Sequence, residues 1–512
     1  MSTTGLFADY LNAFARVERF YPAGAPFDWA GLAARARVVA GGYPPARRAA
    51  MAQALRRQNP GNALAELFAQ PGTVAIITGQ QVGLFGGPLL SLHKAMTAVL
   101  VAERLRARGV AAVPVFWMAT QDHDLAEVDH AWLLDSASVP QRISVELPAT
   151  GGAVGPMPLG PAITETLAAA ERCCPGEYLA DLRAAYTPTA TLGSAFAAVY
   201  QKWFAPWNLL TFDPLQAPEA DAIWQPYYLA AFDRQPELAA RLGARSAELS
   251  AAGYHAQVEQ TAAASMLFLS DKGRRLGLRR VHERWLIGEE AADAASLRER
   301  IAAHPEQVSP AALLRPVLQD AAVPVAAQVT GPAETSYLAQ SAVLFDALGV
   351  DPPVAWPRAR VTLVDAKARR LLTKYNLTVA DVRATPAAEL LAQRALPPEI
   401  EQQTAALQSA FDQGFAPLAA SIAQLDPTLS DAAEGAALKI RHQLEQLSLR
   451  VGRSLARRST ELASQAQHLD ALLAPQRQPQ ERLLTSAPFS TCLSSLSHSL
   501  DPAMPVEQTV EI

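Results

Sequence analysis

The stretch from residue 73 to residue 130 constrains the fold more than any other part of the chain. A β-branched run, TVAII, leads into the glycine-rich segment TGQQVGLFGGP, and a helical stretch and a second apolar run, VPVFWM, follow. This succession is typical of a parallel βαβ crossover. Ligands of open α/β sheets bind at the carboxyl ends of the strands, which here are residues 78–81 and 121–124. We therefore expect both polar loops to face one crevice.

The surrounding pattern extends this unit to an α/β core with insertions. Residues 1–70 are predicted to be a helical flank, in which Tyr10, Leu11, Phe14 and Val17 are spaced for one helix face. Residues 71–365 alternate strand-like runs with helical stretches, which predicts a mostly parallel sheet. The runs expected to form its strands are 74–77, 113–118, 209–212, 323–329 and 354–356. Insertions are expected at about 135–205 and 250–310, the second with a β-hairpin around Asp271-Lys272-Gly273.

Residues 366–484 are predicted to form a separate helical domain. Its apolar residues step by sevens, fours and threes in two series: Ile400, Leu407, Phe411, Leu418, Ile422 and Leu425, then Ile440, Leu444, Leu447, Val451 and Leu455. This predicts an antiparallel coiled coil of two helices joined near Asp426-Pro427. Burial of its apolar stripes against a second copy of the chain, as a homodimer, is the preferred interpretation, and packing within one chain is the alternative. Residues 485–512 are expected to be a docking tail.

Charge and composition limit the classes of partner. Lys and Arg number 44 and Asp and Glu 49, which gives a net charge of −5 without a long basic run, so a nucleic acid is not expected as partner. No stretch approaches 18 uninterrupted apolar residues and the N-terminus lacks a secretion-signal pattern, so no membrane association is expected. The three cysteines, two of them adjacent, suggest neither a disulfide framework nor a zinc site. We expect a cytoplasmic protein that acts on small molecules.

The glycine-rich turn is a candidate anion site. Glycines at 79, 83, 86 and 87 would let backbone amides approach a ligand, and Pro88 suits the first turn of a helix whose N-terminus favours anions. His93 and Lys94 lie within about two turns of Pro88, where they could supply a donor and a cation to a phosphate. The spacing matches neither the dinucleotide nor the Walker pattern, so a tight turn without a ligand is the alternative. For His93 and Lys94 the alternative is a surface or packing role.

Asp122, His123 and Asp124 follow the apolar strand that ends in Phe116-Trp117-Met118. Flanking carboxylates favour the imidazolium form of His123, which makes this residue a candidate acid, base or orienter of a substrate amine. The carboxylates could bind the ammonium group of an amino acid, which we prefer, or a divalent cation. A metal site that includes His130 and a purely structural network are the alternatives.

A later segment repeats the design of strand, loop and helix. The run VPVAAQV ends at Thr330-Gly331-Pro332-Ala333-Glu334, so Gly331 permits close approach while Glu334 and Tyr337 can face the same crevice, with substrate or ribose contacts. Arg315 and Arg358 each adjoin a proline, which suits a guanidinium that holds an anion. An interdomain salt bridge is the alternative for either arginine.

Three long motifs carry a resemblance to a known family. GQQVGLFGGPLLSLHKA, PVFWMATQDHDLAEVDH and the stretch from SPAALLRPVLQD to PRARVT resemble the BshC family, the proposed cysteine ligases of bacillithiol biosynthesis, and AFARVERFYP, DKGRR and PQER extend the likeness to essentially the whole chain. The resemblance implies a Rossmann-like core related to class I synthetases, a dimerising coiled coil, and a reaction that joins the cysteine carboxylate to the amine of glucosaminyl-malate. One departure is Gln121, which stands where the family usually has an acidic residue.

The resulting hypothesis is an amide-forming ligase that uses ATP or another nucleotide with Mg²⁺, with no resident metal site. The residues expected to be catalytic are His93, Lys94, Asp122, His123 and Asp124. Those expected to bind the nucleotide are Gly79, Gln80, Gln81, Gly83, Gly87, Gly331 and Glu334, and those expected to bind substrate are Arg315, Tyr337 and Arg358. A non-catalytic metabolite-binding dimer and a metal-dependent hydrolase are the alternatives.

Overall fold

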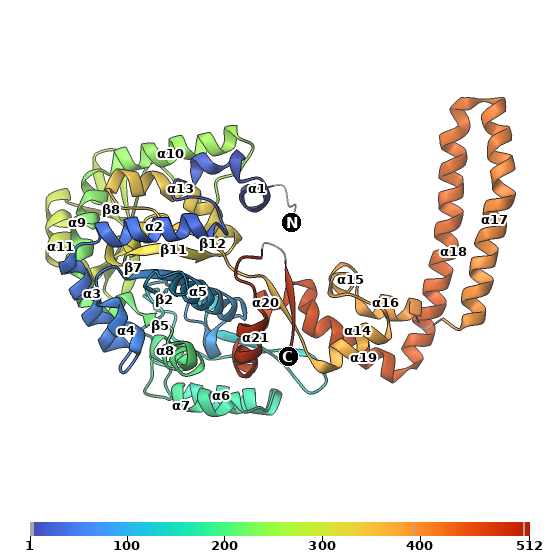
Figure 1. The fold of residues 1–512 in the computed structure, drawn as a ribbon, viewed down its shortest axis with the longest axis horizontal. Coiled ribbons are helices and arrows are strands. Elements are labelled where there is room, and N and C mark those ends of the chain that lie inside the picture. Colours follow the sequence, from blue (N-terminus) through green and yellow to red (C-terminus); the bar gives the residue numbers. More distant parts are fainter. Residues whose placement is uncertain (1–4, 395, 505–506) are drawn as a thin grey trace. The chain divides into compact units, whose positions relative to one another are not determined.

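The chain folds into two compact units in a computed structural model that describes residues 5–394, 396–504 and 507–512 (Figure 1). The first unit comprises Met1–Leu133, Arg142–Val361 and Leu484–Val510, and the second comprises Leu134–Gln141, Thr362–Leu483 and Glu511–Ile512. Among the described helices, none combines the length and the apolar character needed to cross a membrane.

The five apolar runs that the sequence singled out form one parallel sheet in the first unit. Its strand order is β12-β11-β1-β2-β5, and every neighbouring pair is parallel. The strands are β1 (Val74–Gln80), β2 (Ala112–Met118), β5 (Leu210–Phe212), β11 (Val325–Thr330) and β12 (Val354–Pro357). Strand β11 begins two residues later than expected, because the Val323 amide closes the last turn of the preceding helix on Gln319 at 2.9 Å. The predicted α/β class with a Rossmann-like sheet is confirmed.

Helices cover both faces of this sheet because its strands are apolar on both faces. Ile76 and its neighbour Val74 pack in a core with helices α2 (Trp29–Gly42) and α5 (Leu90–Arg106). Ala75 and Ile77 pack in the other core, whose helices include α3 (Pro45–Gln58), α4 (Ala63–Phe68), α9 (Pro218–Asp233), α12 (Arg315–Ala322) and α13 (Pro332–Leu348). The alternation of the strand therefore fixes the sheet between two helical layers.

The N-terminal segment departs from its prediction as one continuous helix. Helix α1 (Leu6–Asn12) ends before Phe14, and two short 3₁₀ turns, Phe14–Arg16 and Glu18–Phe20, follow. The Tyr10 ring packs 4.3 Å from the Tyr21 ring, and the Tyr10 hydroxyl donates to the Ala355 carbonyl. These tertiary contacts require the chain to fold back, and they outweigh the local helical pattern. Val17 is nevertheless buried.

The hairpin expected around Asp271 belongs to a larger antiparallel sheet. Strands β6 and β7 pair on either side of Lys272 and Gly273, whose φ values of 47° and 77° suit a two-residue hairpin turn. The sheet has the order β10-β6-β7-β8-β9. Its strands are β6 (Ala264–Asp271), β7 (Arg274–Val281), β8 (Arg284–Ile287), β9 (Glu290–Ala292) and β10 (Val308–Pro310).

The remaining elements of the first unit connect these layers. They are helices α6 (Ala162–Cys173), α7 (Tyr178–Ala185), α8 (Leu192–Trp203), α10 (Gln235–Ala251), α11 (Ala294–Ala303) and α21 (Leu493–Ser499). The short strands β3 (His130–Leu134), β4 (Pro140–Ser144), β13 (Val361–Val364) and β14 (Gln508–Glu511) extend to or across the limits of this unit.

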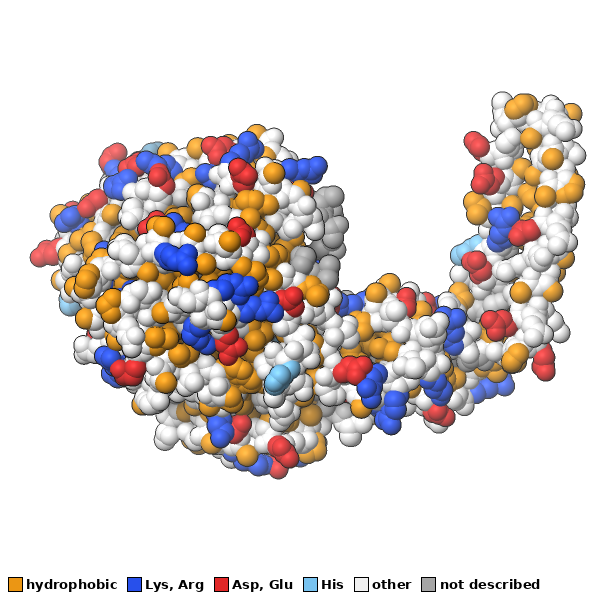
Figure 2. Space-filling model, in the orientation of Figure 1, with side chains coloured by type: hydrophobic (Ala, Val, Ile, Leu, Met, Phe, Trp, Pro, Cys, Tyr) orange, Lys and Arg blue, Asp and Glu red, His pale blue; other side chains and the backbone are white. Residues whose placement is uncertain are grey.

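The second unit is helical, and its longest helices form the predicted coiled coil. Helices α17 (Pro398–Leu425) and α18 (Ser430–Arg458) run antiparallel, and the Asp426 carboxylate caps the turn between them by accepting the Thr428 amide at 2.9 Å. Much of the apolar stripe stays on the surface, since Leu425 is 85% and Leu447 60% exposed (Figure 2). The other helices are α14 (Ala366–Lys374), α15 (Val379–Ala384), α16 (Ala387–Arg394), α19 (Thr460–Leu473) and α20 (Gln480–Leu483).

Candidate functional site

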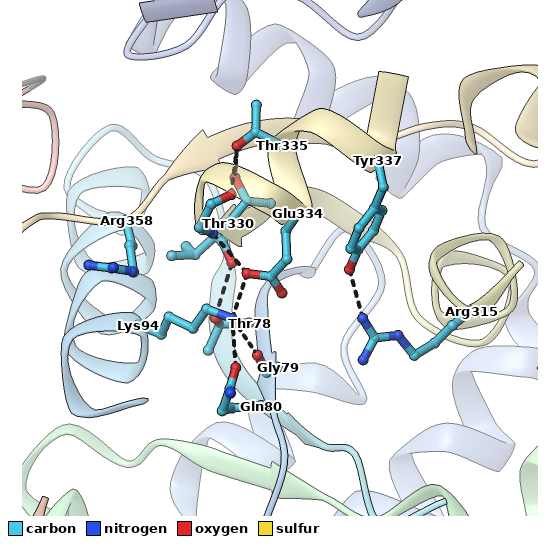
Figure 3. Close-up of polar contacts among 12 residues, drawn as sticks. Thr78, Gly79, Gln80, Lys94, Arg315, Thr330, Glu334, Thr335, Tyr337 and Arg358 are labelled. Carbon is cyan, nitrogen blue, oxygen red and sulfur yellow. Dashed lines mark hydrogen bonds and ion pairs between the residues drawn. The ribbon is translucent and has the colours of Figure 1, made fainter. Parts of the chain in front are cut away.

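Lys94 lies at the centre of a polar cluster at the carboxyl ends of β1 and β11 (Figure 3). Its ammonium nitrogen Nζ donates to the Gly79 carbonyl at 2.8 Å and to Gln80 Oε1 at 3.1 Å, and it lies 2.5 Å from Glu334 Oε2. Its side chain is only 4% exposed. Since an ammonium group has three N–H donors, the three acceptors satisfy it, and Lys94 joins the end of β1 to helix α13.

Glu334 is held from two sides. The same oxygen, Oε2, accepts the backbone amide of the N-cap residue Gly331 at 2.8 Å at the start of α13. Burial lowers the pKa of Lys94, and the Glu334 carboxylate opposes this shift. Figure 3 shows the other carboxylate oxygen of Glu334 directed toward the side on which Arg315 lies. That oxygen can meet a ligand while Oε2 keeps the side chain in place.

Two arginines flank the cluster and make it cationic. Arg315 Nη2 donates to the Tyr337 hydroxyl at 2.7 Å. Arg358 follows β12 and is 7% exposed, and its backbone amide donates to the Thr330 carbonyl at 2.8 Å. Burial raises the pKa of Tyr337 to about 12, so the phenol is neutral. Lys94, Arg315 and Arg358 oppose one carboxylate, Glu334, and this excess of positive charge attracts anionic ligands.

The loop after β2 brings Asp122 to the same end of the sheet. Asp122 Oδ2 accepts the Gln81 amide side chain at 2.9 Å, and Oδ1 accepts the His123 backbone amide at 2.7 Å. Burial alone would raise the pKa of Asp122, but these hydrogen bonds and the charge of Arg275 outweigh it and lower that pKa. Asp122 is therefore an anion, and the loops after β1 and β2 meet through Gln81.

Arg275, on β7 of the antiparallel sheet, is a site residue that the sequence reasoning missed. Its Nη1 lies 3.1 Å from His123 Nδ1, while Nη2 donates to the Pro310 carbonyl at 2.9 Å. The guanidinium carbon lies 3.8 Å from the centre of the Phe268 ring. Burial lowers the pKa of Arg275 to about 10. The charge of Asp122 raises this pKa, and the charge of Arg315 lowers it. The two clusters are thus electrostatically linked, and the signal available beforehand was the DKGRR hairpin.

Asp124 and His130 lie less centrally. Asp124 is exposed and precedes a short 3₁₀ turn, Leu125–Glu127. His130 Nδ1 lies 2.9 Å from the carboxylate of its neighbour Asp129. Among the residues that the structure describes, no three His, Cys, Asp or Glu side chains gather closely enough to hold a metal ion. The described residues therefore offer no set of metal ligands in support of the metal-dependent hydrolase hypothesis.

A partly buried carboxyl at the end of β5 was also missed by the sequence reasoning. Asp213 accepts a hydrogen bond from the Thr120 hydroxyl, which belongs to the loop after β2. Burial raises the pKa of Asp213. This pair joins two neighbouring strand ends and supports the loop that carries Asp122.

The glycine-rich turn packs closely on the protein itself. Gly86 and Gly87 have positive φ values, 87° and 68°. A Cβ atom on Gly83 would lie 2.8 Å from Gly87 Cα, and one on Gly86 would lie 2.6 Å from the Trp203 ring. These contacts account for the glycines as packing residues, and a nucleotide role for Gly79, Gly83 and Gly87 stays a prediction.

The chain after residue 483 packs on this turn. The Leu89 amide donates to the Leu484 carbonyl at 2.7 Å, and the Ser486 amide donates to the Gly87 carbonyl at 2.9 Å. Helix α5 begins at Leu90, so Pro88 precedes the helix instead of forming its first turn as expected. His93 is fully buried within α5, whereas Lys94 reaches the polar cluster.

Fold and site together define an α/β protein with a Rossmann-like sheet, a C-terminal helical hairpin and a largely cationic site at the strand ends. Two family models match this division of the chain. The N-terminal Rossmann-like domain of bacillithiol biosynthesis BshC matches residues 1–359, and the C-terminal coiled-coil domain of BshC matches residues 361–504. The chain belongs to the BshC family, as the sequence motifs indicated.

Full-length relatives support this assignment. The chain is 37% identical to a protein of Solibacter usitatus over 100% of its own length and 96% of the relative. It is 37% identical to one of Koribacter versatilis over 95% and 92% of the two chains, and 32% identical to one of Salinibacter ruber over 99% and 96%. Each of these relatives is named "putative cysteine ligase BshC".

Proposed function

We propose that the protein is a ligase that joins the carboxylate of cysteine to the amine of glucosaminyl-malate, the last step of bacillithiol synthesis. The family and the names of its full-length relatives support the class of reaction. The observation that supports the acceptor is the cationic cluster of Lys94, Arg315 and Arg358, because malate carries two carboxylates that guanidinium groups bind well. A cytoplasmic location, where free cysteine stays reduced, belongs to the same proposal.

The ionised carboxylates suit the ammonium groups of the substrates. Asp122 has a lowered pKa and can hold the ammonium group of cysteine. Glu334 is fixed through Oε2, so its other oxygen can accept a hydrogen bond from the acceptor amine. Arg315 and Arg358 would hold the malate portion, and Tyr337 would orient the Arg315 guanidinium. In this arrangement the two carboxylates bind the amino groups of the substrates, and the two arginines bind the carboxylates of the malate portion.

Use of ATP with Mg²⁺ also belongs to the proposal. A nucleotide would supply the activation that a free carboxylate needs for amide formation. Its phosphates would not use the backbone amide of Leu89 at the start of α5, because that amide already donates to the Leu484 carbonyl. Gln80 and Gly331, expected to contact the nucleotide, bond with Lys94 and Glu334 in this structure.

Product formation from cysteine and glucosaminyl-malate, measured by mass spectrometry with and without ATP and Mg²⁺, tests the proposal. Product that needs both the wild-type chain and ATP supports a nucleotide-dependent ligase, and product without ATP overturns the nucleotide part alone. Asp122→Asn is the site variant and should lose at least about 100-fold in rate. Arg279→Met is the control, because Arg279 bonds with Gly288 and Glu289 at the surface.

Absence of product under every condition would overturn the ligase assignment. In that case thermal melting with ATP, cysteine and glucosaminyl-malate tests the alternative of a non-catalytic metabolite-binding protein. Stabilisation by one of these compounds without turnover would identify a metabolite-binding protein.

A homodimer through the coiled coil completes the proposal. Leucines on both helices stay more than half exposed: Leu407, Leu418 and Leu425 on α17, and Leu438 and Leu447 on α18. An apolar stripe of this kind on a long helical hairpin favours burial against a second copy of the same stripe.

A further inference from the structure

His123 is contacted by two residues of the antiparallel sheet and by its own neighbour in the loop after β2. Its ring nitrogen Nδ1 lies 3.1 Å from Arg275 Nη1 and 3.5 Å from Asp122 Oδ1. Phe268 on β6 lies beside it, with ring centres 6.0 Å apart. The side chain is 45% exposed. The nitrogen Nδ1 is therefore the one that the protein engages.

The chemistry of arginine decides which partner controls the ring. A guanidinium group has only N–H donors, so a hydrogen bond between Arg275 and Nδ1 requires Nδ1 to be the acceptor. Asp122 Oδ1 is farther from Nδ1 and already accepts the His123 backbone amide at 2.7 Å. A neutral imidazole whose Nδ1 accepts carries its proton on Nε2.

Arg275 is itself fixed in place. Its Nε donates to the Ser309 hydroxyl at 3.0 Å, its Nη2 donates to the Pro310 carbonyl, and its plane packs on Phe268. Its backbone amide donates to the Gly151 carbonyl at 2.9 Å. The guanidinium therefore presents Nη1 in one direction at little further cost in side-chain entropy.

We propose that Arg275 is a positioning residue that holds His123 as a neutral imidazole with its proton on Nε2, so that His123 serves the substrate as a hydrogen-bond donor. This role rests on the proposed ligase function, in which the carbonyl oxygen of the cysteinyl group is the acceptor. A donor aimed at that oxygen stabilises the negative charge that develops when the amine attacks. His123 is then not the base that takes the proton of the acceptor amine.

The tautomer can be measured without any turnover. In nitrogen-15 spectra of histidine-labelled protein at pH 8, the signals lost in His123→Gln belong to His123, one of nine histidines. In wild-type protein, His123 should have an unprotonated Nδ1 and a protonated Nε2, and Arg275→Lys should keep this state. Arg275→Met should lose it, while Arg279→Met, on the same strand, should match the wild type. A wild-type Nδ1 that carries a proton would overturn the proposal.

The rates of product formation by two His123 variants distinguish a hydrogen-bond donor from a general base. His123→Ala should reduce the rate of product formation by about 100-fold, as loss of one such donor does. His123→Gln keeps an N–H donor that cannot act as a base, and it should retain a rate within about tenfold of the wild type. Equal losses in the two variants would overturn the donor role. A wild-type chain that forms no product would contradict the proposed ligase, whereas the tautomer measurement would still stand.

Discussion

At the scale of single residues, the buried Lys94 and the partly buried Glu334 act as one ion pair. The Lys94 side chain is 4% exposed, and its ammonium group bonds with three acceptors. One oxygen of Glu334, Oε2, contacts both this ammonium group and the Gly331 amide. Removal of one partner from such a pair leaves the other buried and uncompensated, which costs more than the pair itself contributes. The pair therefore fixes the site and also contributes to the stability of the fold.

Lys94→Met should lower the free energy of unfolding by about 3 kcal/mol, measured by urea denaturation at pH 7.5. The double variant Lys94→Met with Glu334→Gln should lose less, because no charge is then left without its partner. Lys202→Met, at an exposed position of α8, is the control and should change stability by less than about 0.5 kcal/mol. Equal losses in Lys94→Met and the double variant would contradict the pairing.

Asp221 on α9 should make stability depend on pH. Burial, with Glu306 and Glu219 nearby, raises the pKa of Asp221 to about 6. Because the folded chain binds this proton more tightly than the unfolded chain, whose pKa is about 3.9, stability falls as pH rises from about 4 to about 6. Asp221→Asn should therefore raise the free energy of unfolding by about 1 to 2 kcal/mol at pH 7.5, after a discount for partial exposure, and by much less at pH 4.

Urea denaturation at both pH values checks the Asp221 prediction. Asp233→Asn serves as the control, since Asp233 lies on the same helix and pairs with Arg298. That variant should keep the wild-type fall in stability between pH 4 and pH 6. If Asp221→Asn keeps the same fall, Asp221 is not the group that titrates.

At the scale of elements, local patterns predicted the strands, but they did not indicate what packs on the glycine turn. The parallel strands are short, apolar on both faces and bounded by glycine or proline, so their residues alone indicate them. The glycines at 83, 86 and 87 predicted either an anion site or a tight turn without a ligand. The atoms that require those glycines come from Trp203 and from the turn itself, and Leu484 and Ser486 complete the packing from the far end of the chain. Contacts so distant in sequence leave no local signal.

This packing predicts that the glycines matter for folding in the absence of any ligand. Gly86→Ala should lower the melting temperature well below that of Gly109→Ala. Both positions have positive φ, 87° and 76°, but a Cβ atom would meet the Trp203 ring only at Gly86 and has open space at Gly109. The difference between the two variants therefore measures the steric clash, with backbone strain common to both. Equal melting temperatures would show that the turn has room for a side chain.

At the scale of the whole molecule, the candidate site depends on segments that lie far apart in the sequence. Sequence order placed the loops after β1, β2 and β11 at one end of the sheet, because parallel strands share their carboxyl edge. Sequence order did not predict that Arg275 belongs to the site, since the antiparallel sheet lies outside the βαβ pattern and Arg275 is 152 residues from His123. A topology rule predicts which loops of one sheet converge, but an inserted sheet obeys no such rule. The C-terminal coiled coil was predictable for the opposite reason, since its periodic stripe is a property of local sequence alone.

The proposed dimer makes a last prediction at this scale. Wild-type protein should sediment as a dimer, and Leu407→Glu combined with Leu447→Glu should sediment as a monomer, because each change places a charge on the apolar stripe that the second copy would bury. Gln443→Glu, at an exposed position of α18, adds a charge beside the stripe and should stay dimeric. Circular dichroism should show unchanged helix content in both variants. A wild-type monomer, or a double variant that remains dimeric, would exclude the stripe as the interface.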